Sequence, residues 1–341
     1  MKMKEWMELD IDNLELEQVT ELEKQRVKQH VFKKRKKTPI WKSMAMAAVI
    51  LVSGTAITTF AFPSVASQIP FMNNVISYFN DDYGQYTNFE AFSDDLGLVD
   101  TDNGVSILID HAVYDGTNII VSYALEMEKN LGEFIAIKGG NWFDVKGATS
   151  MGGSDQIIQI DDTHYIGVAE FTPRFKNDEQ PETIEVIWEP KAFYNHDTGE
   201  EIKGDWSFNF SLNRLEGTVL AVNETAENAH LSLALNSIEF TDVSTILAYK
   251  QFASEDLRKE WLSVTPTFTV KDDLGNIYVD GLGGGGMTSD DFKTFTGTTS
   301  FGAIKEGATK LFIKPTVIAS LENGLGNKKI PLDVIVVELP D

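Results

Sequence analysis

The 341-residue chain contains no cysteine. This absence excludes disulfide scaffolds, cysteine nucleophiles and thiolate metal sites. Its folded parts must therefore be stabilised by core burial, which domains of more than roughly 100 residues can supply. A hydrophobic fraction of 42% and an aromatic fraction of 11% are typical of packed cores and argue against wholesale disorder.

Charge is absent from residues 43–62, which read SMAMAAVILVSGTAITTFAF. A helix of that length spans about 30 Å, the thickness of the hydrocarbon layer of a bilayer. Five consecutive cations, 33–37, precede it, whereas residues 63–80 contain neither Lys nor Arg. The positive-inside rule then predicts a single-pass protein of the cell membrane, with residues 1–42 in the cytoplasm and the remainder outside.

Two other interpretations of this apolar segment stay open. The first is a cleaved signal peptide, because Ser64-Val65-Ala66 resembles a cleavage site, although a charged region of about 40 residues is far longer than usual. The second is a buried core helix, which five adjacent cations disfavour. Both the membrane helix and the signal peptide place the large portion outside the membrane.

The acidic excess belongs to that large portion. The chain has 29 Lys and Arg against 52 Asp and Glu, and residues 63–341 hold 18 of the cations and 44 of the acids. Such a balance repels nucleic acid and anionic lipid head groups, so we expect no nucleic-acid partner. The basic run of the tail, in contrast, suits anionic membrane lipid.

Motifs for catalysis or metal binding are also missing. The five histidines form no HxH or HExxH spacing, and neither GxSxG nor a phosphate loop occurs. The glycine run 281–286 lacks the Lys-Ser/Thr of a nucleotide loop, and we interpret it as a flexible hairpin tip. Asp100-Thr101-Asp102-Asn103 is the nearest approach to a calcium loop, but solvated turns are favoured for the acidic pairs. We therefore expect no enzyme, no cofactor and no metal site.

The cytoplasmic tail carries the candidate partner-binding residues. They are apolar side chains interleaved with acids within residues 1–19: Trp6, Leu9, Ile11, Leu14 and Leu16. Thr20-Glu21-Leu22-Glu23 is a capping box that predicts a helix through Lys37. The tail is too short to fold alone, so it is either a disordered tether or a peptide that orders on a cytoplasmic partner.

An internal repeat organises the outer part. The segment from Val105 to Tyr123 resembles the segment from Leu231 to Tyr249, at an offset of 126. Three further pairs follow in order: Phe143–Lys146 with Phe268–Lys271, Ile184–Pro190 with Thr309–Pro315, and Trp206–Leu212 with Leu332–Glu338. Four matches at near-constant offset predict two copies of one β domain.

The predicted fold is therefore mostly β, with two tandem immunoglobulin-like β-sandwich domains after a single transmembrane helix and a short helical tail. The predicted parts are a tail (1–42), a membrane helix (43–62), a connector with an amphipathic helix over 68–80 (63–98), a first sandwich (99–216) and a second sandwich (217–341). The sequence FASEDLRKEW, 252–261, predicts one or two helical turns inserted into the second copy.

The chain also resembles a known family. The stretches EKQRVKQHVFKKRKK, IPFMNNVISYF and DNGVSILIDHAVYDGTNIIVSYALE look like the domain of unknown function 4179 proteins of Gram-positive bacteria. The second copy is similar to the immunoglobulin-like domain of unknown function that often follows it. Many members are described as anti-sigma-factor-like and lie beside genes for extracytoplasmic-function sigma factors. The resemblance implies a tail that binds a cytoplasmic sigma factor and an outer part that senses an unknown ligand or protein.

Two functions remain open at this point. The leading hypothesis is a membrane-anchored, anti-sigma-like regulator. The alternative is an anchored envelope protein that binds surface polymer or protein partners and has no signalling role. A secreted hydrolase has no supporting constellation of residues.

Overall fold

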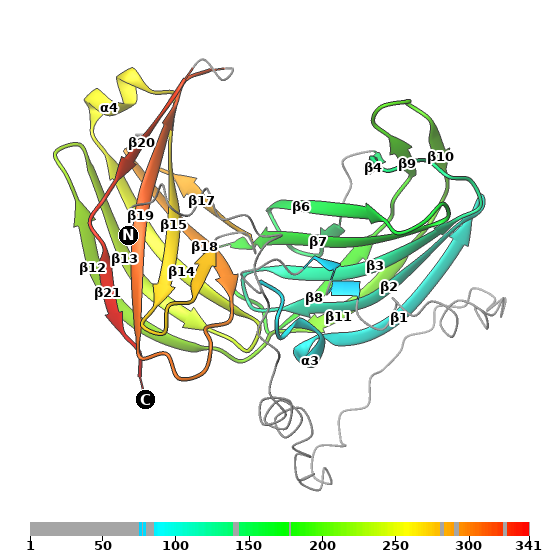
Figure 1. Ribbon diagram of the computed structural model, residues 1–341, viewed down its shortest axis with the longest axis horizontal. Coiled ribbons are helices and arrows are strands. Elements are labelled where there is room, and N and C mark those ends of the chain that lie inside the picture. The colour runs from blue at the N-terminus through cyan, green and yellow to red at the C-terminus, as the bar shows by residue number, and fades with distance from the viewer. Residues whose placement is uncertain are drawn as a thin grey trace, which may run out of the picture. The chain divides into compact units, whose positions relative to one another are not determined.

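The computed structural model describes residues 75–76, 78–79, 85–138, 143–176, 179–279, 283–289, 293–322 and 326–340. The tail, the predicted membrane helix and most of the predicted helix over 68–80 lie outside these residues. Within the described ranges, no helix has the length and apolar character needed to span a membrane. What the structure describes is mostly β, in several antiparallel sheets (Figure 1).

The first copy contains a five-stranded sheet with the order β1-β2-β3-β7-β6 and a three-stranded sheet with the order β11-β8-β5. The strands of the larger sheet are β1 (Asp94–Asp102), β2 (Val105–Tyr114), β3 (Ile119–Met127), β7 (His164–Arg174) and β6 (Ser150–Gln159). Those of the smaller sheet are β11 (Phe208–Asn213), β8 (Thr183–Trp188) and β5 (Phe143–Val145). A further small sheet is formed by β10 (Glu201–Lys203), β9 (Ala192–Asn195) and β4 (Ile135–Lys138).

One apolar core lies between the two main sheets of the first copy. Alternate residues of β2, such as Ile107 and Ile109, face alternate residues of β8, such as Val186 and Trp188, and all four are fully buried. The Trp188 ring stacks on Phe143 at a centroid distance of 4.7 Å. This period-two burial explains why both segments form strands, since each presents one apolar face to the other sheet.

The second copy repeats the five-stranded sheet as β12-β13-β14-β18-β17, facing a sheet in which β15 and β21 both pair with β19. The larger sheet consists of β12 (Thr218–Glu227), β13 (Leu231–Phe240), β14 (Ser244–Ala253), β18 (Thr294–Gly302) and β17 (Gly284–Thr288). The facing sheet consists of β16 (Ile277–Val279), β15 (Ser263–Asp272), β19 (Lys310–Ser320), β20 (Asn327–Pro331) and β21 (Ile335–Glu338).

The two larger sheets share their irregularities as well as their strand order. Register shifts fall at positions 126 residues apart in the two copies: between Asp95 and Leu98 and between Ala221 and Glu224, then between Ile109 and His111 and between Leu235 and Ser237. A bulge changes which side chains reach each face, so shared bulges require the same inward and outward pattern. The offset of 126 over β2 and β3 is thus a structural equivalence.

Two of the four sequence pairs are misaligned. Val186 pairs with Val145 in the first copy, and Ile313 pairs with Val270 in the second. Because Val145 and Val270 are equivalent, Val186 of β8 corresponds to Ile313 of β19, at an offset of 127 rather than the predicted 125. The predicted alignment of 206–212 with 332–338 is wrong by one residue, because it matches buried Phe210 with Val336, which is 50% exposed. Because side chains alternate between faces, a one-residue slip is enough to exchange core and surface.

Three other expectations meet the structure directly. The helical insertion is confirmed as α4 (Glu255–Glu260), with Ser254 as its N-cap. Strand β1 begins at Asp94, inside the segment predicted as connector. The hairpin tip predicted for the glycine run is wrong for Gly284–Gly286, which belong to strand β17. At Gly286 a Cβ atom would lie 2.0 Å from the ring of Phe295, so glycine permits close packing there.

Candidate functional site

The end of the connector is bound to the outer face of the first copy's larger sheet. Val75 is fully buried and packs against Ala124 of β3 and Ile166 of β7. Val75 is one of the apolar residues whose helical spacing predicted an amphipathic helix over 68–80, with Ile69, Met72, Ile76 and Phe79. A fully buried valine contributes about 1.5–3 kcal/mol relative to an exposed one.

A second cluster extends the contact. Ile76, Tyr86 and Phe89 are buried against Val113, Ile120 and Val168, which lie on the same outer face. Phe89 opens the short helix α3 (Phe89–Phe92). The cluster also includes Val243, which precedes β14 of the second copy. The connector therefore contacts both copies.

One polar contact lies within this apolar docking surface. The Tyr86 hydroxyl donates a hydrogen bond to Oε1 of Glu170 on β7, and Glu170 is 6% exposed. Burial raises the pKa of the Glu170 carboxyl to about 7, while the hydrogen bond from Tyr86 opposes that rise. A titratable group thus lies under the connector, where its charge state changes the cost of docking.

The outer faces of the two larger sheets differ at two equivalent positions. Val113 and Ala124 correspond, at the offset of 126, to Glu239 and Lys250 of the second copy. Lys250 is exposed and Glu239 forms an ion pair with Arg214, whereas Val113 and Ala124 pack in the apolar clusters that contain the connector residues. The difference explains why the connector docks on the first copy.

The two copies meet through a buried polar network. Asn118, in the turn between β2 and β3, donates to Oγ of Ser300 at 2.8 Å and accepts from Oγ1 of Thr172 at 2.7 Å. Asp115 accepts hydrogen bonds from the backbone of Thr117 and Asn118, and from Oγ of Ser244 at 2.6 Å. Asn118 and Asp115 are each 1% exposed. The network fixes which residues of the two copies face each other.

An ion pair flanks this network. Nη2 of Arg214, in the segment between the copies, lies 2.6 Å from Oε1 of Glu239. The Arg214 side chain covers Gly116, where a Cβ atom would lie 2.5 Å from Nε. Gly116 has a φ of +97°, so glycine is required there both by the backbone and by the close approach.

A groove of about 450 Å³ lies at the same joint. Its polar lining includes Thr172 and Arg174 of the first copy and Tyr249, Thr296 and Thr298 of the second. A ligand in this groove would contact both copies. Its described lining combines polar residues with apolar surface, and these residues form no catalytic or metal-binding arrangement.

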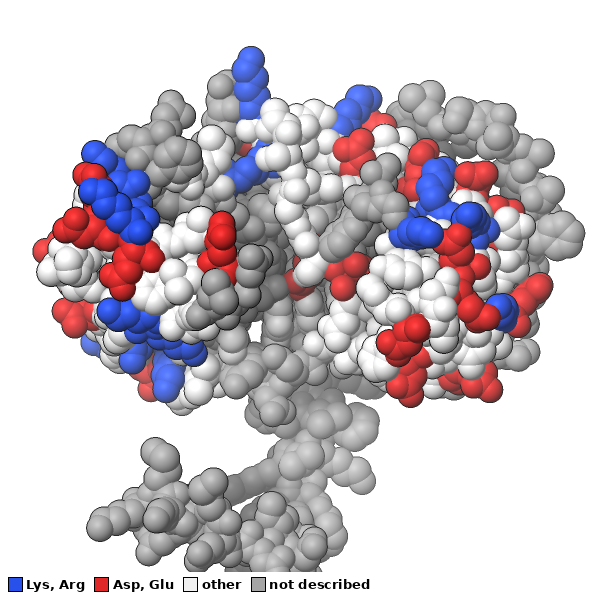
Figure 2. Space-filling model, turned by 90° about the horizontal axis from the view of Figure 1, so that it is seen from above, with Lys and Arg blue, Asp and Glu red and all other residues white. Residues whose placement is uncertain are grey.

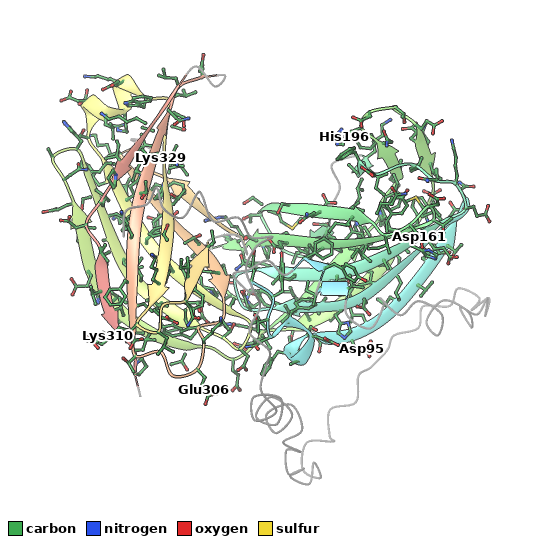
Figure 3. All side chains as sticks on the ribbon, viewed as in Figure 1. Asp95, Asp161, His196, Glu306, Lys310 and Lys329 are labelled. Carbon is green, nitrogen blue, oxygen red and sulfur yellow. The ribbon has the colours of Figure 1, made fainter. Side chains whose placement is uncertain are left out.

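The residues considered as candidates from the sequence do not gather at one place. Those of the tail lie outside the described residues: Trp6, Leu9, Ile11, Leu14 and Leu16. In Figure 3, Asp95, Asp161 and His196 lie at separate places in the first copy and do not point toward one another. Within the described part of the chain, no group of His, Asp and Glu is arranged to hold a metal ion.

Several acidic side chains accept hydrogen bonds from other groups of the protein. Asp100 accepts from the backbone N–H of Ser207 and Asp102 from that of Asp205. Asp272 accepts from the Tyr278 hydroxyl at 2.8 Å. Lys and Arg are interspersed with Asp and Glu on the face shown in Figure 2.

Sequence reasoning missed three residues that matter at these contacts: Tyr86, Glu170 and Asn118. Nothing in their local pattern shows that they are buried, because each is covered by a segment distant in the sequence. The Asp115-Gly116 dipeptide predicts a turn close to Asn118, but nothing in the sequence identifies the partner of Asn118 in the second copy.

Two family models match the chain. Residues 34–127 match the Domain of unknown function (DUF4179), and residues 217–339 match the Family of unknown function (DUF5643). The resemblance drawn from the sequence is thus confirmed as the presence of these two domains. The first match runs through the connector into β1, β2 and β3, and the second spans the second copy.

Among solved structures, the chain is similar to the conserved domain protein from Bacillus anthracis, with 25% identity and a TM-score of 0.68 over 78% of this chain and 98% of that one. The N-terminal periplasmic domain of ScsB from Proteus mirabilis has 11% identity and a TM-score of 0.22, over 70% and 97% of the two chains, which is too low to imply a shared fold. No curated protein matches the chain.

Proposed function

We propose that the chain is a non-enzymatic, membrane-anchored regulator of the anti-sigma type. Residues 43–62 cross the cell membrane, the tail 1–42 binds a sigma factor in the cytoplasm, and two immunoglobulin-like sandwiches bind a ligand or protein outside. The domain matches are consistent with this function but carry no activity of their own.

The observation that supports regulation over passive anchoring is the docking of the connector. The predicted membrane helix ends at Phe62, and 13 residues later Val75 is fully buried on the outer face of the first copy's larger sheet. It also reaches the second copy, where Nδ2 of Asn88 donates to the backbone oxygen of Asp242 at 2.8 Å. A change at the joint of the copies therefore bears on the segment that leads to the membrane. A simple tether needs no such contacts.

The tail has the chemistry of a binding peptide. Trp6, Leu9 and Leu14 cannot be buried within so short a segment, so a partner must bury them. Each buried side chain of this size contributes about 1.5–3 kcal/mol, enough in combination to offset the ordering of a disordered peptide. The interleaved acids suit a basic groove, such as the DNA-binding surface of a sigma factor, and favour fast association.

The test uses residues 1–37 as a capture peptide. We expect them to capture a sigma factor from the native host, and Trp6→Ala with Leu14→Ala to weaken the capture. Asn13→Ala with Gln18→Ala truncates two polar side chains of the same segment and is the matched control. Sigma-dependent transcription should rise in cells whose chain lacks residues 2–19.

The alternative is an anchored envelope protein with no signalling role. It gains support if no sigma factor is captured and deletion of residues 2–19 leaves transcription unchanged. Under that outcome the tail sets topology only, and the outer copies carry the function.

A further inference from the structure

The facing sheet of the second copy has an apolar outer surface. Its strands β15, β19 and β21 lie side by side (Figure 1), and β16 pairs with β15 at one edge. Five apolar side chains of this surface are each between 37% and 50% exposed: Ile277, Val279, Phe312, Val334 and Val336. We call these five, together with Lys271 and Lys314, the apolar-basic face. Exposed apolar surface that includes polar groups is typical of protein–protein interaction sites.

Strand pairing arranges the apolar-basic face in rows. Ile277 pairs with Lys271, and Lys271 pairs with Phe312. Phe312 also pairs with Val336, so one row crosses four strands, and at the usual strand spacing it is about 14 Å long. Lys314 lies two residues after Phe312 on β19 and therefore projects from the same face. Both lysines thus lie beside Phe312, within the apolar surface.

The first copy has polar side chains at the same places. Glu185 corresponds to Phe312 at the offset of 127 between β8 and β19. Glu185 pairs with Ser211 as Phe312 pairs with Val336, which makes Ser211 the counterpart of Val336. By the same spacing, the counterpart of Val334 is polar as well: Asn209. The sheet therefore forms with a polar outer surface, and its own stability does not require apolar residues there.

The same comparison shows two cations without a counter-ion. Lys146 of the first copy forms an ion pair with Glu185 at 2.9 Å. Lys271 is the counterpart of Lys146, but Phe312 occupies the position that corresponds to Glu185. Neither Lys271 nor Lys314 forms an ion pair with any residue that the structure describes. Both ammonium groups are therefore available to a partner.

This combination of charge and apolar surface restricts what can cover the face. A purely apolar partner would bury two ammonium groups without a counter-charge, which is costly. A second copy of the chain would bring its own lysines into the interface, where like charges repel. An anionic bilayer attracts lysines, but it repels residues 63–341, which hold 44 acids against 18 cations. A protein segment that combines apolar side chains with a few carboxylates satisfies every requirement.

The sheet also determines the backbone conformation of the partner. A sheet face offers side chains only, because the backbone groups of its strands are used in strand pairing. An extended peptide lying across it would leave its own N–H and C=O groups without partners, whereas a helix satisfies these groups internally. A helix of about ten residues is long enough to cover the row that contains Phe312.

We propose that the apolar-basic face binds an acidic amphipathic helix of another protein. The apolar stripe of that helix packs on Phe312, Val334 and Val336, and its Asp or Glu side chains pair with Lys271 and Lys314. The inference names the class of the outer partner, and it rests on the proposed function for the exposure of this face outside the membrane. It does not depend on the tail.

The experiment places a photoreactive benzophenone amino acid at Val336 of the full-length protein, in cells of the native host. We expect irradiation to link the chain to another protein. Mass spectrometry should locate the link in a segment in which apolar residues recur every three or four positions and acids flank them. The matched control carries the same amino acid at Ser211, the counterpart of Val336, and should not give this product.

Three variants test the two kinds of contact. Phe312→Glu installs the residue that the first copy holds there, so the fold should tolerate it, and the link should be lost. Lys271→Ala with Lys314→Ala keeps the apolar surface and should reduce the yield about tenfold through two lost charge pairs. Lys176→Ala with Lys250→Ala removes two exposed lysines outside the face and should leave the yield unchanged. Thermal unfolding checks that every variant is folded.

The proposal is overturned if no protein is linked at Val336, or if the link is to lipid or to a second copy of the chain. It is also overturned if the linked segment lacks acids, if Ser211 gives the same product, or if the variant without Lys271 and Lys314 is linked as well as the wild type. Capture of a sigma factor by the tail is a separate measurement, so failure here is distinguishable from failure of the proposed regulation.

Discussion

Tyr86 and Glu170 are hydrogen-bonded although 84 residues separate them, and their contact joins the connector to the sheet on which it lies. The carboxyl is almost fully covered, so its ionisation is opposed by burial and supported by one hydroxyl donor. The free-energy cost of burying this carboxyl under the connector therefore depends on its protonation, since burial raises its pKa to about 7.

The first prediction concerns stability against pH. The pKa of Glu170 is about 7 in the folded protein against 4.5 for an ordinary glutamate, so between these values the folded state holds a proton that the unfolded state has released. Stability must then fall as pH rises from about 4.5 to 7. Relative to Glu170→Gln, the wild type should lose about 2.5 kcal/mol between about pH 5 and about pH 8, measured by chemical unfolding.

Two variants sharpen that measurement. Tyr86→Phe removes the hydrogen bond that holds the pKa down, so its loss of stability should extend to higher pH. The exposed Glu133→Gln should reproduce the wild-type profile. Parallel profiles for wild type and Glu170→Gln would show that the carboxyl is solvated and the docking surface open.

The second prediction concerns docking itself. Val75→Glu places a carboxylate against Ala124 and Ile166, where a buried charge is strongly unfavourable. We expect the connector to detach, with faster amide hydrogen exchange over residues 85–92 and unchanged exchange in β13 and β14. Tyr78→Glu, at a position that is 48% exposed, is the control. Loss of protection throughout both copies would instead make the connector part of a single cooperative core.

The third prediction concerns the joint between the copies. Asn118→Ala removes the partner of Ser300 and of Thr172 at once and leaves buried polar groups unpaired. The free energy of unfolding should fall by about 2–4 kcal/mol in chemical denaturation. Asn209→Ala, which removes a hydrogen bond from exposed Asn209 to Glu185, should cost less than about 0.5 kcal/mol. Equal effects of the two variants would contradict the role given to the joint.

The fourth prediction concerns topology. If residues 43–62 cross the membrane, protease added to intact protoplasts should remove the mass of residues 63–341 and leave the tail protected. Lysed protoplasts, in which the tail is accessible, are the control. Full-length protein recovered as a soluble cytoplasmic species would refute the membrane anchor and the regulation that depends on it.

The amino-acid pattern was sufficient to predict that the chain after the connector is mostly β and that Val105–Tyr123 is equivalent to Leu231–Tyr249. These segments have strong period-two alternation, and a shared bulge keeps their register constant. The alignment of the two copies by sequence failed in β8 and β11. These strands are short, so two alternative registers match apolar residues about equally well. The pairing of β8 with β5 and of β21 with β19 identifies the correct register, and the sequence of a single strand does not reveal such long-range pairing.

The docking surface was beyond sequence reasoning for a related reason. Val113 and Ala124 face outward on a sheet whose other face is already the core, so their apolar character demands a partner only once the sheet is built. Only the comparison with Glu239 and Lys250, their counterparts in the second copy, singles them out.

The covered outer face also dictates where the chain can be cut. A fragment that starts at residue 99, the boundary predicted from the sequence, would lack the first residues of β1 and the connector residues that pack on the outer face. The apolar residues of that face would then be exposed to solvent: Val113, Ile120, Ala124, Ile166 and Val168. Such a contiguous apolar surface makes a protein self-associate. A fragment that starts before Val75 retains its own cover and should remain monodisperse in solution.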